Sequence, residues 1–461
     1  MYSVIRSGAH EAPMHVALVF EDQDQLPSTF EALDGSSQQA FAAAHAMPGF
    51  RGEVGETCVA PDHRHLLLGA GKHEQFTLHT LRRAAGRLVK HLDRMHAAGL
   101  HTHLSLNLPD GTDGTLAGRA FGEGLVLGNW RVDEFTGKAS RIEDRRESLD
   151  VAEQDHTINE GVVRGIAHGH STNYARRIAA TPPNICNPPW LVDEAHRLAD
   201  ETGLRVTVID YEEALAKGMG GLTNVGRGSA AKPAMIILEH QPETVAASAS
   251  DLTLALVGKT ITYDTGGYSL KIQGGMRGMK NDKNGGMAVL GAMHAIATLN
   301  LPIRVVGVLA AAENMISPDA YRPDDIITMY NGVSVEVTNT DAEGRLVLGD
   351  ALAYTTETYQ PAAMVDLATL TGGVVVALGK YSAGIWCNDD GLRARLEQSA
   401  ERTGEKLWRM PLWEEHREFM RAQHADIWNS GPKRDAHATQ GAAFLSYFVD
   451  EKTPWAHIDL A

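Results

Sequence analysis

Residues 252–267 read Leu-Thr-Leu-Ala-Leu-Val-Gly-Lys-Thr-Ile-Thr-Tyr-Asp-Thr-Gly-Gly, an apolar run followed by a polar, glycine-rich segment. The apolar part, 252–257, is typical of a strand that is buried on both faces of a parallel sheet. Functional loops of such sheets lie at the carboxyl ends of the strands, which is where Lys259 and Asp264 come. The closing glycine pair lets the backbone turn sharply or approach a ligand closely. The stretch therefore predicts an α/β fold with a site at this edge of its sheet.

More carboxylates follow in the next part of the chain. Asp282 comes first, and Asp341, Glu343 and Arg345 alternate in the segment N-T-D-A-E-G-R-L. Side chains two positions apart in an extended segment point the same way, so we expect these three to face one site. For an isolated D-x-E-x-R pattern, a solvated turn that carries mixed charge is the favoured interpretation. Together with Asp264, however, the chain offers four carboxylates, which suit two divalent metal ions.

These motifs resemble those of the leucyl aminopeptidase family, the cytosol aminopeptidases. The matching segments are V-G-K-T-I-T-Y-D-T-G-G-Y-S-L-K at 257–271, M-K-N-D at 279–282, N-T-D-A-E-G-R-L at 339–346 and D-L-A-T-L-T-G at 366–372. They agree with the family pattern in order and spacing as well as in content. A weaker similarity is the W-A-H-I-D segment that begins at Trp455. The first 150 residues carry no diagnostic motif.

The resemblance implies a centre with two divalent ions, Zn or Mn, with Mg or Co as alternatives. The implied metal ligands are Lys259, Asp264, Asp282, Asp341 and Glu343. In the family pattern Asp264 and Glu343 bridge the two ions, Lys259 and Asp282 complete the tighter site, and Asp341 completes the more exchangeable one. An amine coordinates a metal only after it loses its proton, so the pKa of Lys259 must be lowered by the cations and by burial.

Two further residues match catalytic positions of the family. The resemblance implies that Lys271 polarises the scissile carbonyl and stabilises the developing oxyanion. It also implies that Arg345 holds a bicarbonate ion that acts as the general base. The positions that match the substrate pocket are Met279, Thr369, Leu370 and Gly372. A methionine is also an ordinary filler of hydrophobic cores, so this pocket set rests on the resemblance alone.

The implied activity is the metal-dependent release of N-terminal amino acids, with a leucine-like preference, through a water activated by two metal ions. The substrates are peptides with a free N-terminus, because the free amino group binds one ion. Two alternatives stay open: a narrower dipeptidase or amino-acid amidase, and a non-catalytic or DNA-organising relative on the same scaffold. Family members are typically hexamers, so we expect a homohexamer.

The composition indicates a cytoplasmic protein. The chain has 461 residues, 43% of them hydrophobic, and a formal net charge of −16, which argues against nucleic-acid partners. Three cysteines, Cys58, Cys186 and Cys387, are too few for a disulfide framework. The start of the chain lacks the apolar stretch of a signal peptide, and no run approaches the ~20 apolar residues of a membrane span.

The chain is expected to form two α/β domains. We predict a smaller N-terminal α/β domain over 1–150, a linking helix over 151–180 and a larger catalytic α/β domain over 181–461, with a central mixed sheet flanked by helices. In the first domain, alternating patterns predict strands over 15–21 and 64–69 and an amphipathic helix over 78–95.

Three features depart from the family pattern. Lys283 and Asn284 stand before a glycine pair where many members have a single residue, and Asp324 occupies a position where glycine is commoner. The sequence also ends at Ala461, inside the W-A-H-x-D element, so either a further glycine-rich segment follows or the pocket is built differently.

Two of the H-x-H pairs formed by the 21 histidines of the chain are candidate metal ligands. His101 and His103 share one face of a predicted strand, and His168 and His170 form the second pair. Because neither pair has a third ligand at a known spacing, we interpret these histidines as surface or core residues rather than zinc ligands.

Overall fold

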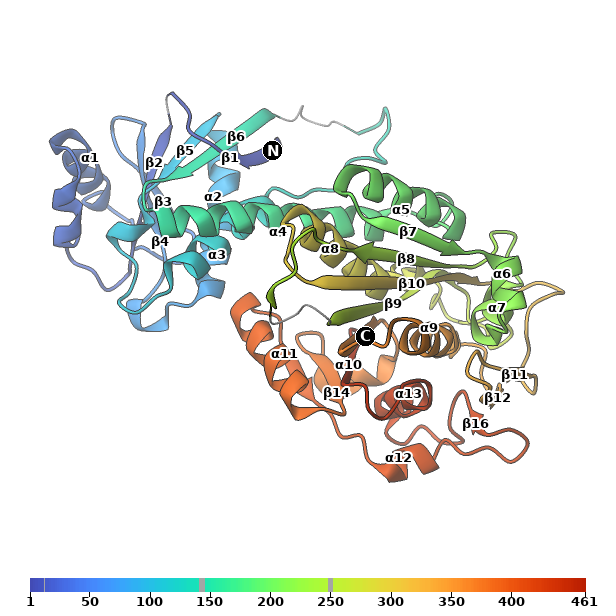
Figure 1. Cartoon of the computed structure of the whole chain (residues 1–461). Coiled ribbons are helices and arrows are strands. Elements are labelled where there is room, and N and C mark those ends of the chain that lie inside the picture. Colours follow the sequence, from blue (N-terminus) through green and yellow to red (C-terminus); the bar gives the residue numbers. More distant parts are fainter. Residues whose placement is uncertain (12, 141–145, 248–251) are drawn as a thin grey trace. The chain divides into compact units, whose positions relative to one another are not determined.

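The computed structural model describes residues 1–11, 13–140, 146–247 and 252–461. It divides into two compact units, each with its own sheet (Figure 1). The first unit contains Met1–Asn173 and Arg402–Gly404, and the second contains Tyr174–Glu401 and Glu405–Ala461. The boundary falls within helix α4 (His156–Ala180). The predicted two-domain α/β class is confirmed.

The first unit holds a six-stranded sheet. Its strands, in spatial order, are β1 (Tyr2–Ser7), β6 (Arg146–Glu153), β5 (Gly99–Thr102), β2 (Met14–Val19), β4 (His65–Gly69) and β3 (Thr57–Val59). All neighbours pair in parallel except β3 and β4. One face packs against helices α2 (Leu78–Arg94), α3 (Gly114–Gly128) and the start of α4, and the other packs against α1 (Gly35–His45). The strands and the helix predicted from alternation are confirmed.

The second unit contains an eight-stranded mixed sheet. Its strands, in spatial order, are β15 (Leu407–Arg409), β14 (Ala383–Cys387), β17 (Trp455–Asp459), β13 (Ala363–Ala368), β9 (Thr253–Asp264), β10 (Arg304–Asn314), β8 (Ala234–His240) and β7 (Arg205–Ile209). The central strand β9 pairs in parallel with both β10 and β13, whereas β8 and β14 run antiparallel to their neighbours β10 and β17.

Helices cover both faces of this second sheet. Helices α5 (Pro188–Thr202) and α8 (Asn284–Thr298) lie on one face, and α7 (Gly220–Gly226) and α9 (Glu343–Tyr359) lie on the other (Figure 1). Each face has its own hydrophobic core, so β9 is buried on both sides, which explains its continuous apolar sequence.

Shorter elements surround the second sheet. They are α6 (Tyr211–Ala216), α10 (Gly372–Leu378), α11 (Asp390–Thr403), α12 (Glu414–Glu418), α13 (His437–Leu445) and a small sheet of β11 (Ile326–Thr328), β12 (Ser334–Glu336) and β16 (Ile427–Trp428). None of the helices in the described ranges combines the length and the apolar character that a bilayer-spanning segment requires.

Two of the departures from the family pattern have a visible structural setting. Asp324 has a φ of 73°, in the left-handed region, which explains why glycine is the commoner residue there. The side chain of Lys283 is fully buried just before α8. Its ammonium group donates hydrogen bonds to the backbone carbonyls of Ala179, Thr181 and Lys280. The extra residue before the glycine pair therefore has a structural role, because it connects the start of α8 to the end of α4.

Candidate active site

The carboxyl ends of β9 and β13 and the start of α9 meet around one cavity of about 580 Å³. All of the predicted site residues line this cavity: Lys259, Asp264, Lys271, Met279, Asp282, Asp341, Glu343, Arg345, Thr369, Leu370 and Gly372. They come from segments that are separated by up to about a hundred positions in the sequence, and the parallel pairing of β9 with β13 brings these segments to the same edge.

Three carboxylates gather most closely at this edge. Asp264, Asp341 and Glu343 each offer an oxygen within 4.8 Å of the others, a spacing that a single cation can bridge. Lys271 lies against the same group, with its Nζ 2.8 Å from Asp264 Oδ2 and 2.6 Å from Asp341 Oδ1. Asn314 and the backbone N–H of Gly266 both donate to the other oxygen of Asp264.

Lys259 occupies the deeper part of the cluster and is 3% exposed. Its Nζ lies 2.8 Å from Asp282 Oδ1 and 3.0 Å from Glu343 Oε1, and it donates to the carbonyl of Thr369. Burial by itself lowers the pKa of Lys259, but the neighbouring carboxylates outweigh burial, so its pKa is raised. Burial and the negative charge of Asp264 raise the pKa of both Glu343 and Asp282.

Three buried carboxylate oxygens of the cluster form no hydrogen bond with the described residues, and one of them, Asp341 Oδ1, has the ion-pair contact with Lys271. Asp282 Oδ2 and Glu343 Oε2 are buried, and no donor among the described residues reaches either atom. A buried acceptor without a partner costs roughly 1–3 kcal/mol, and more when it is charged. Divalent cations satisfy such oxygens directly, so this donor set fits metal ions.

Glycines set the local backbone around the carboxylates. Gly266 and Gly267 have φ values of 85° and 62°, as the predicted sharp turn requires. A Cβ at Gly344 would lie 2.3 Å from Cε of Lys259, so glycine lets the start of α9 pack directly on the lysine stem.

The predicted extended geometry of the segment Asp341 to Arg345 is wrong. Glu343 is the first residue of α9 and Asp341 lies in the preceding turn. The apolar residues that follow in α9 pack in the core against the sheet, and the helix that contains them begins at Glu343. The helix therefore starts inside the segment whose alternation suggested an extended chain. Asp341 and Glu343 nevertheless line the same cavity, although they lie at the start of a helix and not in the expected strand.

Arg345 is buried beside the carboxylates. Its Nη1 donates to the carbonyl of Asn429 over 2.8 Å, while its Nε has no hydrogen-bond acceptor within the described part of the chain. Burial lowers its pKa to about 10, so the guanidinium keeps its charge at neutral pH. This arrangement leaves donor capacity for a small anion.

The sequence did not reveal one wall of the cavity. Residues 430–434 and His437 line it, although they lie in and after an irregular segment without a motif. Asp459, the last residue of β17, was also unassigned. Its carboxylate accepts hydrogen bonds from the backbone N–H groups of Leu370 and Thr371 and from the Thr371 hydroxyl. The W-A-H-I-D segment, noted as a weaker similarity, was the available signal for this residue.

Two α/β units and a buried carboxylate–lysine cluster at the carboxyl edge of the larger sheet define the class of two-domain α/β metallopeptidases. Residues 173–461 match the catalytic domain of the cytosol aminopeptidase family, and residues 16–139 match the N-terminal domain of the same family. The chain belongs to the cytosol aminopeptidase family, a family of metal-dependent exopeptidases. The N-terminal match lies where the sequence offered no diagnostic motif.

Similar proteins span nearly the whole chain. It is 38% identical to the "Probable cytosol aminopeptidase" of Syntrophotalea carbinolica, over 96% of this chain and 90% of the relative. It is 37% identical to the protein of the same description from Aquifex aeolicus, over 96% and 88%. Among solved structures, the bottromycin maturation enzyme BotP in complex with Mn has a TM-score of 0.83 and 32% identity, covering 97% of this chain and 92% of BotP.

Proposed function

We propose that this chain releases N-terminal amino acids, with a leucine-like preference, from peptides with a free N-terminus, and that it uses two divalent metal ions. The observation that carries the proposal is the buried group of Asp264, Asp341 and Glu343, whose oxygens lie within 4.8 Å of one another in a cavity of about 580 Å³. Such a cavity has room for the first residues of a peptide.

The unpaired oxygens of Asp282 and Glu343 support a second ion beside the first. Asp264, Glu343, Lys259, Asp282 and Asp341 would hold the two ions. When bound, the two ions polarise the scissile carbonyl and lower the pKa of water. The oxygen-rich set suits Zn or Mn, with Mg or Co as alternatives, and the description of BotP as a Mn complex favours Mn.

The two lysines have different tasks in this proposal. Lys271 sits at the more open side of the cluster and keeps its charge through Asp264 and Asp341, which together with the surrounding charges raise its pKa against burial. It donates a hydrogen bond to the carbonyl oxygen of the substrate as negative charge develops there. Lys259 acts as a neutral amine ligand, because cations that bind Asp282 and Glu343 remove the contacts that favour its charged form.

Arg345 supplies the anion site in the proposal. Its unpaired Nε and its charge favour a bicarbonate ion as the general base. A bound anion of this kind would explain why the reaction needs no side-chain base.

The apolar part of the cavity sets the specificity. Met279 and Leu370 offer apolar surface for a medium-sized first side chain, while Thr369 and Gly372 lie where they can contact the substrate backbone. The similarity to a bottromycin maturation enzyme favours one second candidate, a peptidase or amidase of the same chemistry with a narrower substrate range. A homohexamer and a cytoplasmic location complete the proposal.

The test is the release of free leucine from Leu-Gly and from N-acetyl-Leu-Gly, with Mn²⁺ or Zn²⁺ and again after chelation. We expect cleavage of the free-amine peptide alone, and only with metal. Cleavage of the acetylated peptide at a similar rate would refute the exopeptidase assignment, and cleavage after complete metal removal would refute the metal centre.

Variants connect the activity to the carboxylates. Asp341→Ala and Glu343→Ala should abolish turnover while leaving the circular dichroism spectrum unchanged. Asp319→Ala, which removes an exposed carboxylate from the same unit, is the matched control and should retain activity. Wild-type rates in either site variant would overturn the ligand assignment. If the wild-type protein cleaves neither dipeptide but binds DNA in a gel-shift assay at physiological salt, the non-catalytic alternative replaces the proposal.

A further inference from the structure

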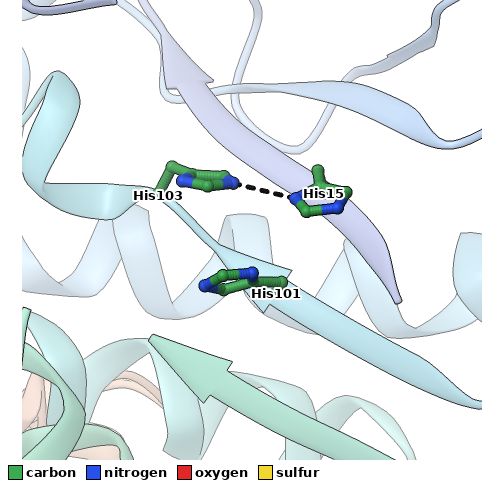
Figure 2. A group of neighbouring side chains, drawn as sticks. All are labelled: His15, His101 and His103. Carbon is green, nitrogen blue, oxygen red and sulfur yellow. Dashed lines mark hydrogen bonds between the residues drawn. The ribbon is translucent and has the colours of Figure 1, made fainter. Parts of the chain in front are cut away.

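Histidines from neighbouring strands gather on one face of the sheet of the first unit. His15 lies in β2, His101 in β5 and His103 directly after β5, and their rings face one another (Figure 2). The strand register explains the grouping, because β2 pairs in parallel with β5 and sets His15 opposite His101. His103 follows two positions later on the same face.

The distances between the rings are those of a ligand group. One ring nitrogen from each of the three histidines lies within 4.8 Å of the others. His15 Nδ1 and His103 Nε2 are 3.0 Å apart, and the centroids of His101 and His103 are 4.8 Å apart. Three imidazole nitrogens around a tetrahedral zinc, at Zn–N of about 2.0–2.1 Å, lie about 3.3 Å from one another. The rings must therefore rotate to bring their nitrogens to that spacing when an ion binds.

A fourth histidine has a different role. His65 of β4 stacks on His15 with centroids 4.8 Å apart, but its own nitrogens contact Asp62 Oδ2 at 2.6 Å and Ser37 Oγ at 3.1 Å. It therefore supports the His15 ring from one side and is already hydrogen-bonded. Phe41 packs its ring edge-on against His65 and His103. Aromatic rings therefore pack against one side of the ligand group, while His15 and His101 are partly exposed.

The ring nitrogens suit metal binding, because imidazole is a common ligand of transition-metal ions. Neutral imidazoles keep one lone pair each, as a metal ligand must. In the absence of a metal, His15 Nδ1 and His103 Nε2 are close enough to form a hydrogen bond with each other.

We propose that His15, His101 and His103 form a second metal site, for a divalent transition-metal ion such as Zn²⁺, with water or an external ligand in the fourth position. Three imidazoles suit Zn, Ni or Cu, whereas the carboxylate-rich cavity of the other unit suits harder ions as well. The bound ion replaces the single hydrogen bond between His15 and His103 and clamps β2 to β5. The site is independent of the proposed peptidase reaction.

The first test counts metal. The full-length protein is loaded with Zn²⁺, dialysed against metal-free buffer and analysed for zinc per chain by mass spectrometry. His101→Gln should retain one zinc fewer than wild type and keep its peptidase activity. His156→Gln, which removes an exposed histidine of the same unit, is the matched control and should retain the wild-type zinc content. Equal zinc content in wild type and His101→Gln would overturn the proposal.

The second test locates the ion without a substitution, so it decides the question even if the variant fails to fold. Crystals of the full-length chain grown with Zn²⁺ should show an anomalous peak at the zinc edge among the three imidazoles. A difference map without such a peak refutes the site. A peak in crystals of a protein that retains no corresponding zinc after dialysis means binding at crystal concentration only, and this also overturns the proposal.

Discussion

Asp459 provides the sharpest test of how the fold holds the substrate cavity. It is fully buried at the end of β17 and accepts hydrogen bonds from Leu370 N at 3.0 Å, Thr371 N at 3.3 Å and Thr371 Oγ1 at 2.6 Å. Thr369, the residue before Leu370, accepts a hydrogen bond from Lys259 at its carbonyl and donates one to Asp282 from its hydroxyl. The segment 369–371 is therefore held by the carboxylate–lysine cluster at one end and by Asp459 at the other. Asp459→Ala removes these three contacts at once, together with the local hydrogen bond from Ala461 N at 3.1 Å.

The magnitude follows from these three bonds. A hydrogen bond to a charged group is worth about 1.5–3 kcal/mol, so three independent bonds would sum to about 4.5–9 kcal/mol. The bonds share one carboxylate and are not additive, and removing one side of a buried charged network costs about 3–5 kcal/mol. We expect a loss of about 3–5 kcal/mol of unfolding free energy for Asp459→Ala. Asp459→Asn should lose about 1–2 kcal/mol, because its amide oxygen still accepts while the charge is gone.

The assay combines urea unfolding with steady-state kinetics at a temperature where the variant is folded. Loosening the pocket segment should lower kcat/KM at least about tenfold, since misplacement of positioning groups by 1 Å costs about a hundredfold. Asp210→Ala is the control: it removes one exposed capping bond to Glu213 N in α6, which costs about 1 kcal/mol and leaves KM unchanged. If Asp459→Ala loses no more than about 1 kcal/mol of stability, as the cap variant does, and keeps the wild-type kcat/KM, the reasoning is refuted.

Two further predictions concern buried charged groups. Lys283→Met leaves three carbonyl groups without their donor and should lower the unfolding free energy by about 3–5 kcal/mol. The control, Lys280→Met, loses a single hydrogen bond to Ala180 and should lower it by about 1 kcal/mol. Equal melting temperatures for the two variants would contradict this prediction. The buried His457 donates to Asp366, and that carboxylate raises the pKa of His457 above 6.5 in spite of burial. The folded state therefore binds the proton more tightly, so the contribution of His457 is complete below pH 6.5 and is lost as pH rises through its folded pKa. The difference in unfolding free energy between wild type and His457→Gln, measured by urea titration at a series of pH values, should shrink as pH rises, and a difference that grows would contradict the assignment.

The sequence predicted those elements whose side chains have the same degree of burial along the whole element. Strand β9 is buried on both faces, so its apolar run was readable without any partner. The carboxylates were readable because each lies in a short motif next to such a strand or at the start of a helix. The extended geometry at Glu343 was wrong because a spacing of two positions does not exclude a helix start. The cavity wall at 430–434 has no periodic pattern, and its position depends on the tertiary contacts of Asn429.

The histidine group shows the same limit more clearly. His15 and His103 are 88 positions apart, and only the pairing of β2 with β5 sets their rings together. An H-x-H pair in one strand predicts two ligands on one face, but the third ligand comes from the neighbouring strand. Its identity depends on strand order and register, which an alternating pattern leaves undetermined.

The pairing of charges explains how four carboxylates can be gathered at one edge of a sheet. Lys259 contacts Asp282 and Glu343, and Lys271 contacts Asp264 and Asp341, so each carboxylate has an ammonium partner within 3.0 Å. The desolvation cost of the acids is thus partly offset by groups that belong to the chain itself. The two ammonium groups offset only part of the charge of the four carboxylates, and the oxygens of Asp282 and Glu343 that lack a partner in the described part of the chain leave the remainder for metal ions to satisfy. In the proposed mechanism, metal ions would replace these ion pairs, and the loss of its contacts with Asp282 and Glu343 would let Lys259 lose its proton.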